Sequence, residues 1–431
     1  MANRRATSTD LRAKVKGKPF VSGLLPWTAR PRRRWFAKCL LLILISSFLP
    51  GCWNSRELND LAIVSAIGID KSSEGGAYQV TFQVVNPSAT ATNAGASTGQ
   101  PPITIYTSTD QTLFGALRKT SKKASRQLFF AHTQLIIVGE NVAKDGIHQL
   151  FDIFERSHEL RLNSLVLISR GTAAASILKV LLPIENLPSL GMVKKTRNTA
   201  AVWGENSETS IYDLIHAATG VSELTISGVK LSGNVEDGKK NNNLEQTDPK
   251  TAVVMSGLAV FKKGKQIDWL DGNEAKGALR AQDRLMQTNQ NIQLDGDQGA
   301  IAINIVYSKT KIKVEVRQGK PVFHLHIEEE GIINETKSAT DISSRTAITA
   351  LEKEMGRNCE QEVMAALQYA QGKQTDIFGF GDELKRTRPE VWTSLEANWD
   401  SLFAQAELDV QVESYIRSTG MRLKPYLSDS E

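Results

Sequence analysis

The sequence predicts a mixed fold, in which an α/β N-terminal part is followed by an α+β C-terminal part. Three observations indicate this. Between residues 103 and 180, apolar β-branched runs alternate with stretches of helical periodicity, as in an α/β layer. Between residues 301 and 327, apolar and polar residues alternate strictly, as in an antiparallel sheet with one solvent-exposed face. After residue 341, apolar residues recur every three or four positions, as in a long amphipathic helix.

We expect three domains behind an N-terminal leader. Residues 1–51 form the leader, 52–190 a mixed-sheet α/β domain, 191–285 a small middle domain, and 286–431 an α+β domain whose antiparallel sheet packs against long helices. Residues 234–250 almost lack apolar side chains, which predicts a surface loop within the middle domain.

The elements of the first domain follow from periodicity and end signals. Strands are expected at 61–69, 78–85, 103–106, 128–138 and 160–168, the first two as a hairpin, with a low-complexity loop at 86–102. Helices are expected from an Asp110 cap to Ala124, over 143–154, and from a Thr172 cap to Val180 before Pro183.

One side of the first expected helix is basic. Four bases fall on it, namely Arg118, Lys119, Lys122 and Lys123, and Arg126 follows just beyond the expected end of the helix. Such a set is compatible with anionic lipid, but it is more often a solvated face.

The remaining elements are predicted in the same way. Residues 187–208 are expected to be irregular, and a helix to run from Ser210 to Ala218. Strands are expected at 224–231, 253–261, 265–270, 301–307, 311–317, 321–327 and 408–416. A helix starts at Asp271 or Asn273 and ends near Met286. The longest runs from Asp341 or Ser343 to Ala370 and is ended by Gly372, and another covers 389–403.

The leader carries an export signal. Basic residues at 32–34 and 38 precede an apolar run, Leu40–Leu49, which is about half the ~20 residues that span a bilayer. The sequence Leu49-Pro50-Gly51-Cys52 follows and resembles a bacterial lipobox. That resemblance implies cleavage between Gly51 and Cys52, with diacylglycerol on the Cys52 sulfur and an acyl chain on its nitrogen. The alternatives are an uncleaved N-terminal anchor and, from the arginine pair before Trp35, a twin-arginine signal.

Removal of the leader reverses the net charge. The chain has 431 residues and a formal charge of +5 from 52 bases and 47 acids. The leader holds eleven bases and one acid, so 41 bases and 46 acids remain and the mature charge is −5. The basicity belongs to the export signal, and it gives no indication of nucleic-acid binding.

Cysteine usage excludes an internal disulfide. Of the three cysteines, Cys39 leaves with the leader and Cys52 is the lipidation candidate. Cys359 then stands alone, on the apolar stripe of the longest expected helix, where it is expected to be a core residue. Folding of the exported chain therefore rests on core packing.

Motifs of the common enzyme classes are missing from the sequence. It has no Walker phosphate loop, no G-x-S-x-G elbow and no H-E-x-x-H pair, so no catalytic or metal residue is assigned. His324, His326 and Glu328 share one strand face, and we interpret them as an exposed polar face. Phe378-Gly379-Phe380-Gly381 is more distinctive, either as an interaction segment or as a packed corner between helices.

Four segments, taken together and in order, resemble one family. They are Cys52-Trp53-Asn54-Ser55-Arg56-Glu57-Leu58-Asn59-Asp60-Leu61-Ala62, then Leu128-Phe129-Phe130-Ala131-His132-Thr133-Gln134, then Gly257-Leu258-Ala259-Val260-Phe261-Lys262 with Trp269-Leu270, and Asp376-Ile377-Phe378-Gly379-Phe380-Gly381. They are similar to the Ger(x)C lipoproteins, the C subunit of bacterial spore germinant receptors, over essentially all of 52–420. The residues before about Arg30 depart from that pattern.

The resemblance implies a function without catalysis. It implies a three-domain lipoprotein on the outer face of the spore inner membrane, acting in nutrient sensing with multi-spanning A-type and B-type subunits. It implies no cofactor besides the lipid on Cys52, and no ligand pocket in this chain, because the germinant is thought to bind the membrane subunits.

Two other classes compete with this hypothesis. A solute-binding lipoprotein of an uptake system needs two similar doubly wound lobes around a cleft, and the predicted second half has no matching lobe. A surface hydrolase needs a nucleophile and a base in one constellation, which the sequence does not offer.

Overall fold

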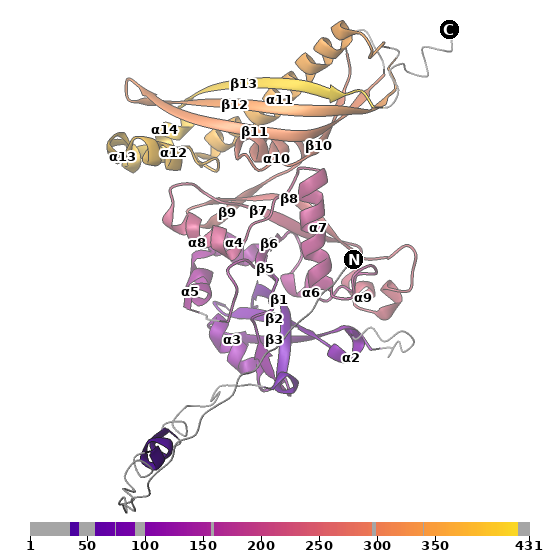
Figure 1. Ribbon diagram of the computed structural model, residues 1–431, viewed down its shortest axis with the longest axis vertical. Coiled ribbons are helices and arrows are strands. Elements are labelled where there is room, and N and C mark those ends of the chain that lie inside the picture. The colour runs from indigo at the N-terminus through magenta and orange to yellow at the C-terminus, as the bar shows by residue number, and fades with distance from the viewer. Residues whose placement is uncertain are drawn as a thin grey trace, which may run out of the picture. The chain divides into compact units, whose positions relative to one another are not determined.

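The structure is a computed structural model that describes residues 35–42, 57–73, 75–90, 100–156, 159–294, 299–338 and 340–420. The chain divides into two units, Met1–Arg56 and Glu57–Glu431. In the first unit, residues 35–42 are helical. The second is the body of the protein (Figure 1). Within the described ranges no helix combines the length and the apolar character needed to cross a membrane.

One large mixed sheet forms the N-terminal two thirds of the body. Its path is β3-β2-β1-β5-β6-β7-β8-β9, with β4 beside the start of β1. The strands β1, β5, β6 and β7 run parallel, and β2, β3, β8 and β9 extend the sheet by antiparallel pairing. The bounds are β1 Leu61–Lys71, β2 Tyr78–Val85, β3 Ile103–Asp110, β4 Gln127–Phe129, β5 Leu135–Gly139, β6 Leu165–Ser169, β7 Thr225–Ser232, β8 Ala252–Lys262 and β9 Lys265–Leu270.

The hairpin expected from 61–69 and 78–85 is confirmed, but the single strand expected at 128–138 is wrong. It is two strands, β4 and β5, because the pairing of β1 shifts register between Val64 and Ala66. Residues 61–63 of β1 pair with β4, and residues 66–69 pair with β5. A bulge bends its strand locally, and on this edge of β1 the residues before and after the bend pair with two separate strands.

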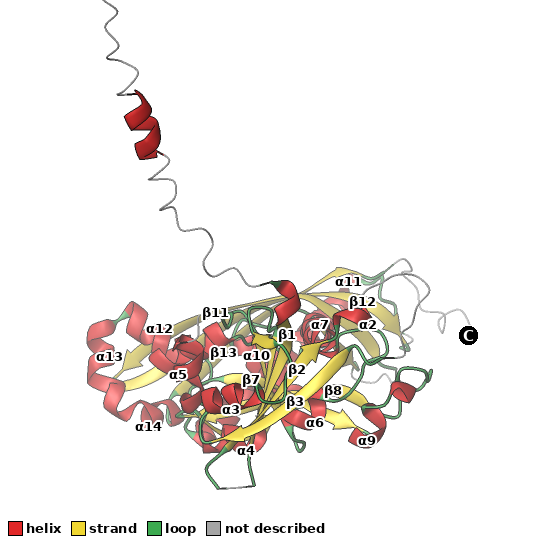
Figure 2. Ribbon diagram, turned by 90° about the horizontal axis from the view of Figure 1, so that it is seen from below, coloured by secondary structure: helices red, strands yellow, loops and turns green. Residues whose placement is uncertain are grey.

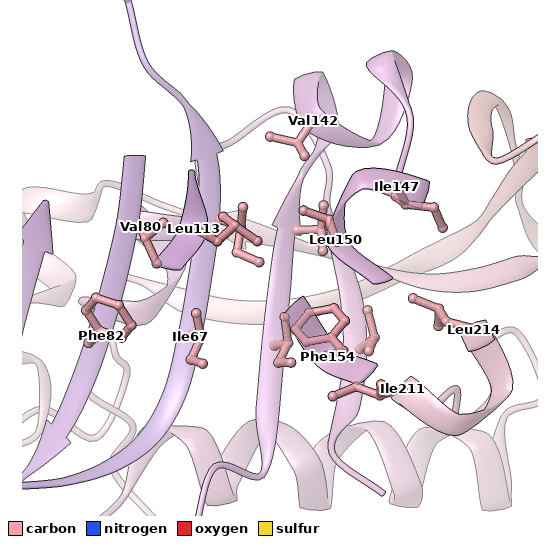
Figure 3. Packing of buried hydrophobic residues seen from close by; sticks show 14 of the residues in the cluster. Ile67, Val80, Phe82, Leu113, Val142, Ile147, Leu150, Phe154, Ile211 and Leu214 are labelled. Carbon is pink, nitrogen blue, oxygen red and sulfur yellow. The ribbon is translucent and has the colours of Figure 1, made fainter. Parts of the chain in front are cut away.

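Helices cover both faces of the large sheet. On one face, α3 (Leu113–Thr120), α4 (Glu140–Asp145), α5 (His148–Arg156) and α8 (Ile211–Thr219) enclose a buried cluster. In it Phe82, Phe154 and Ile211 point into one space between sheet and helices (Figure 3). On the other face lie α6 (Ala174–Leu178) and α7 (Pro188–Val202). Figure 2 shows α3 and α5 to one side of β1–β3 and α6 and α7 to the other. The short α2 (Pro87–Thr90) precedes residues 91–99 of the expected loop, which lie outside the described residues.

Helix starts in this part differ from the sequence predictions. Thr112, not Asp110, caps α3, and its hydroxyl accepts from Gly115 N at 2.9 Å. The helix expected at 143–154 is broken at Gly146, whose φ of 132° no other residue adopts readily. Thr172 was expected to cap the helix that ends at Val180, but Asp70 caps it instead. The carboxylate of Asp70 accepts from the amides of Ala174 and Ala175 at 2.8 Å.

The expectation of an irregular stretch at 187–208 is wrong. Residues 188–202 form α7, which begins with Pro188 in its first turn, where the missing N–H costs nothing. Gly191 packs on Leu182 and Glu185, too close for a larger side chain. The polar run Lys194–Arg197 therefore lies on a helix with one buried side, and the glycine that suggested a loop marks a close contact.

A second sheet of four strands forms the C-terminal part, in the order β10-β11-β12-β13. The first three are antiparallel, as the meander predicted, but 301–307 and 311–317 belong to one 17-residue strand. The last strand runs parallel to β12, because a helical crossover joins the two. The bounds are β10 Thr288–Ile292, β11 Ile301–Arg317, β12 Lys320–Thr336 and β13 Glu407–Ser418; β10, rich in Asn and Gln, was not predicted.

Helices lie on one face of this sheet and leave the other bare (Figure 1). The longest helix starts after Ser344 and ends at Gln374 in a left-handed conformation, so Gly372 lies inside it. The helix expected at 389–403 starts at Pro389 but is interrupted by a 3₁₀ turn. The bounds are α9 Val235–Gly238, η2 Asn241–Asn243, α10 Gly272–Ala281, α11 Arg345–Lys373, α12 Phe380–Thr387, α13 Pro389–Leu395, η3 Glu396–Asn398 and α14 Trp399–Ala404.

Residues 191–285 do not form a sheet of their own. Strands β7, β8 and β9 continue the sheet of β1–β6, so the boundary expected at 190 falls inside one sheet. Leu258 and Leu270 of that sheet share a buried cluster with Phe323 of the second sheet. The loop expected at 234–250 contains α9 and η2, and Asn243 in it is buried, donating to Leu181 O at 3.0 Å. The described body has no pair of similar lobes, which argues against the solute-binding alternative.

A buried ion network fixes α10 between the two sheets. The Arg280 side chain is 0 % exposed, and its Nε lies 2.7 Å from Glu329 of β12, also 0 % exposed. Its Nη1 donates to Glu362 of α11. Burial lowers the pKa of Arg280, but the carboxylates of Glu329 and Glu362 outweigh it and hold that pKa above its ordinary value. At Gly277 a Cβ would overlap the Glu362 carbonyl oxygen, so only glycine lets α10 and α11 pack this closely.

We expect Arg280→Met to lower the free energy of unfolding by about 3–5 kcal/mol, because it leaves the Glu329 carboxylate buried without its partner. Urea unfolding followed by circular dichroism measures this. The matched control is Arg156→Met, which breaks the exposed Arg156–Asp152 pair and should cost less than about 1 kcal/mol. Equal losses in the two variants would contradict a structural role for the network.

Candidate functional site

The expected lipidation site lies outside the described residues. The structure does describe the point at which the segment after this site enters the body. Gly51 and Cys52 precede Glu57, the first described residue of the body, and the 3₁₀ turn η1 (Leu58–Asp60) leads directly into β1. Leu61, the first residue of β1, pairs in parallel with Gln127, the first residue of β4. The segment that follows Cys52 and the turn that precedes β4 therefore reach the body at the same end of these two strands.

The segment 128–134 contains the end of β4 and the arch, residues 130–134, that joins β4 to β5. Phe130 is buried and meets Phe82 edge to face, with ring centroids 5.8 Å apart. Thr133 is buried as well, and its carbonyl accepts from Ser164 Oγ at 2.8 Å. Thr133 Oγ1 donates to the Val64 carbonyl at 3.3 Å. These contacts tie the arch to β2, to the bulge of β1 and to the residue before β6, so the segment shapes the sheet.

An open hollow of about 490 Å³ lies beside this arch. Its polar lining includes His132, Gln134, Arg161, Arg197 and Glu208. Arg197 Nε lies 2.9 Å from Glu208, and Ser210 Oγ donates to Asp213 at 2.7 Å within the cap of α8. These groups are engaged in local structure, and none of these contacts activates a nucleophile.

The segment 376–381 surrounds one buried carboxylate. Asp376 Oδ1 accepts from the amides of Phe378, Gly379 and Phe380 at 3.1 to 3.3 Å, and Oδ2 accepts from Gly381 N at 2.7 Å. The Trp399 indole adds a fifth donor at 3.2 Å. Burial raises the pKa of Asp376, and these donors oppose that rise.

The same corner joins the two sheets. Phe380 is fully buried and stacks on Phe323 of β12 with ring centroids 4.1 Å apart. The Asp376 carbonyl accepts from Glu223 N at 2.8 Å, beside the start of β7. Asp382 accepts from the amides of Val221 and Ser222 at 3.0 Å. Because Phe378 is also buried, the aromatic rings are core residues, and the packed corner is the reading that the structure supports.

The histidine strand face does not converge on a metal position. His324 Nδ1 lies 2.7 Å from Asp409 of β13, and His326 Nε2 lies 3.8 Å from Glu413. The His324 contact lowers the pKa of Asp409. Of the residues that the structure describes, no three of His, Cys, Asp and Glu could together hold a metal ion. Cys359 is 0 % exposed, and burial raises the pKa of its thiol well above the ordinary value, which confirms it as a core residue.

Comparison with known proteins gives the family. The spore germination protein N-terminal domain matches residues 54–231, and the spore germination B3/GerAC-like C-terminal domain matches residues 256–420. Over 397 residues the chain is 34% identical to spore germination protein KC of Bacillus subtilis strain 168, covering 90% of this chain and 97% of that protein. The chain belongs to the Ger(x)C family of spore germination proteins.

Further matches agree with this membership. Spore germination protein YndF of the same strain is 25% identical over 406 residues, covering 89% of this chain and 95% of that protein. The crystal structure of the GerBC protein matches with a TM-score of 0.52 and 20% identity, covering 81% of this chain and 96% of that one, so the two share a fold. The Ger(x)C family is not an enzyme family, and the role of its members is in spore germination.

In this Ger(x)C chain, two of the recognised segments are internal supports of the fold. The segment 128–134 fixes the bend in β1, and the corner at 376–381 wraps Asp376. Sequence reasoning quoted Asp376 in the motif but missed that it organises the turn, and it missed Trp399 and Asp382 altogether. The available signal was an aspartate shortly before a glycine-rich turn, a position from which its carboxylate reaches the following amides.

Asp376→Asn tests whether this Ger(x)C corner depends on a carboxylate. An amide in place of Oδ2 would face two buried donors, Gly381 N and the Trp399 indole, so we expect a loss of about 2–4 kcal/mol in the free energy of unfolding. Urea titration monitored by circular dichroism gives the value. Glu383→Gln, in the next helix, breaks only the exposed pair with Arg386 and should change stability by about 0.5 kcal/mol. A corner held mainly by its aromatic rings would instead leave Asp376→Asn as stable as that control.

Proposed function

We propose that this protein is the lipid-anchored, non-enzymatic subunit of a nutrient-sensing spore germinant receptor. It resides on the outer face of the spore inner membrane, held by diacylglycerol on Cys52, with an acyl chain on the nitrogen of the same residue. Its partners are an A-type and a B-type membrane subunit. No cofactor or nucleic acid takes part.

The lipobox is the observation that carries this proposal. Cys52 directly follows a short apolar run and precedes a body whose residues 54–231 and 256–420 match the germination family. Two acyl chains bury far more CH₂ groups than one, so the attachment is stable without a membrane-spanning segment. The relatives are named spore germination proteins, which supports a place in the same process.

The rigidity of the body also favours an interaction role. The two sheets share a core through α10 and the Asp376 corner, so the body presents fixed surfaces. The bare face of the second sheet carries paired charges, such as Arg417 with Glu330 and Lys313 with Glu315. Polar surface of this kind is compatible with docking against the extracellular loops of membrane subunits.

Lipidation is tested by labelling the wild type and Cys52→Ala with radioactive palmitate. Label should enter the wild type and be absent from Cys52→Ala, which should also appear in the soluble fraction, because Cys52 supplies the sulfur of the thioether. Cys359→Ala is the matched control and should keep full labelling, since Cys359 is buried. Equal labelling of wild type and Cys52→Ala would refute the anchor.

Membership in a receptor complex is tested by affinity purification from detergent-solubilised spore membranes, with a tag after Glu431. Two polytopic proteins should co-purify with the wild type. An untagged strain controls for nonspecific capture. Recovery of this chain alone, with its lipid attached, would count against the partners while leaving the anchor intact.

A further inference from the structure

We propose that the turn joining α3 to β4, residues 121–126, faces the membrane and binds anionic phospholipid headgroups as a second point of attachment. The inference rests on the proposed lipid anchor at Cys52. It extends that proposal by assigning the surface of the body that meets the bilayer and the class of lipid that the surface recognises.

The first argument is the charge pattern of this segment. From residue 111 to residue 139 the chain has five bases and no acid, although the mature protein as a whole is acidic. In the structure this stretch forms α3, the turn 121–126, β4 and β5. Lys122, Lys123 and Arg126 in the turn are all exposed, and so are Arg118 and Lys119 in the last turn of α3. Basic groups near an anionic membrane each strengthen binding about fivefold.

The second argument is the position of the tether. Gln127, which directly follows the turn, pairs with Leu61, and only the 3₁₀ turn η1 separates Leu61 from Glu57. From Cys52 to Glu57 the chain advances by five residues, which span at most about 17 Å when fully extended. A lipid on Cys52 therefore holds this end of β1 and β4 close to the headgroups. Arg126 lies at that end, directly before Gln127, and Lys122 lies in the same turn, whereas the ammonium groups of Lys119 and Lys123 donate to the carbonyls of Thr109 and Thr107 in β3.

The third argument comes from electrostatics of the whole body. A protein with a net charge of −5 is repelled by an anionic surface, so the tethered body can approach it favourably only through a locally basic face. Screening limits that attraction to about 8 Å at physiological ionic strength, so the bases nearest to the tether matter most. Figure 1 shows α3 and β11 at opposite ends of the body, which leaves the second sheet away from the bilayer.

The test uses the mature lipidated protein in vesicles, with a fluorescent donor on a single introduced cysteine and an acceptor on the lipid headgroups. Ser125→Cys labels the basic turn, and Ser418→Cys labels the end of β13; both serines are exposed. Cys359 stays unlabelled because it is buried. Vesicles are either pure phosphatidylcholine or phosphatidylcholine mixed with phosphatidylglycerol.

With phosphatidylglycerol, we expect energy transfer from position 125 to be much stronger than from 418, and to fall when salt is raised. The variant Lys122→Gln/Lys123→Gln/Arg126→Gln should lower the docking equilibrium constant about 100-fold, from about fivefold per base, and reduce transfer from position 125 to its value in pure phosphatidylcholine. The matched control, Lys311→Gln/Lys313→Gln/Arg317→Gln, removes three exposed charges from β11 and should leave transfer unchanged.

Each failure has a distinct outcome. Wild-type protein that does not sediment with vesicles would overturn the anchor and this inference together. Sedimentation with equal transfer from positions 125 and 418, or with transfer insensitive to the three substitutions in the turn, would overturn the inference alone. If the basic turn binds an acidic partner protein and not lipid, the protein should sediment without the expected difference in energy transfer, because these vesicles contain no other protein.

Discussion

The buried contact of Arg280 with Glu329 and Glu362 holds the two sheets in one body. Helix α10 follows the last strand of the first sheet and leads into the first strand of the second, and seven of its ten residues, Ala275 to Ala281, are buried. Gly277 allows α11 to approach, and the ion network then binds α10 to α11 and to β12. A charge network in a core is a weak source of stability compared with apolar packing, and we infer that here it selects one arrangement of its partners. It therefore fixes the relative position of the elements that meet there.

The Asp376 corner contacts the same junction, since Gln282 at the end of α10 donates to the Ile377 carbonyl at 2.8 Å. A carboxylate without solvent needs several donors, and here the backbone of 378–381 and the Trp399 indole supply them. Gly379, at a φ of 87°, allows the backbone to turn around the carboxylate of Asp376. This turn places the ring of Phe380 against the ring of Phe323, on which it stacks. The segment with the most distinctive sequence in the C-terminal half is thus an internal joint. Its aromatic side chains lie inside the body.

Sequence reasoning reached the strands and the long helix because their periodicity is set by local burial, as in β1, β2 and α11. It failed where distant contacts decide. The bulge near Ser65, which splits 128–138 into two strands, shows only in the pairing of β1. Asp70 caps α6 from about a hundred residues away, and no local pattern contains that information. The parallel direction of β13 follows from the crossover and not from its own alternation. Of the candidate site, the lipobox stays a prediction from a linear segment of the sequence, whereas the role of Asp376 required the folded chain.

A lipid on a single residue fixes distance to a membrane but not orientation, because rotation about an extended tether is free. A defined orientation of the body on the membrane needs a second contact with the membrane, away from the lipid. An electrostatic contact of this kind requires one face of the body to differ in charge from the rest. The stretch 111–139 provides that difference within an otherwise acidic mature protein, and the parallel pairing of Leu61 with Gln127 brings its basic turn to the tether. If both proposed contacts form, the lipid on Cys52 and the basic turn, then the orientation of the rest of the body relative to the membrane is defined. Since the junction at Arg280 and Asp376 is rigid, orienting β1 and β4 also orients the second sheet at the far end of the body.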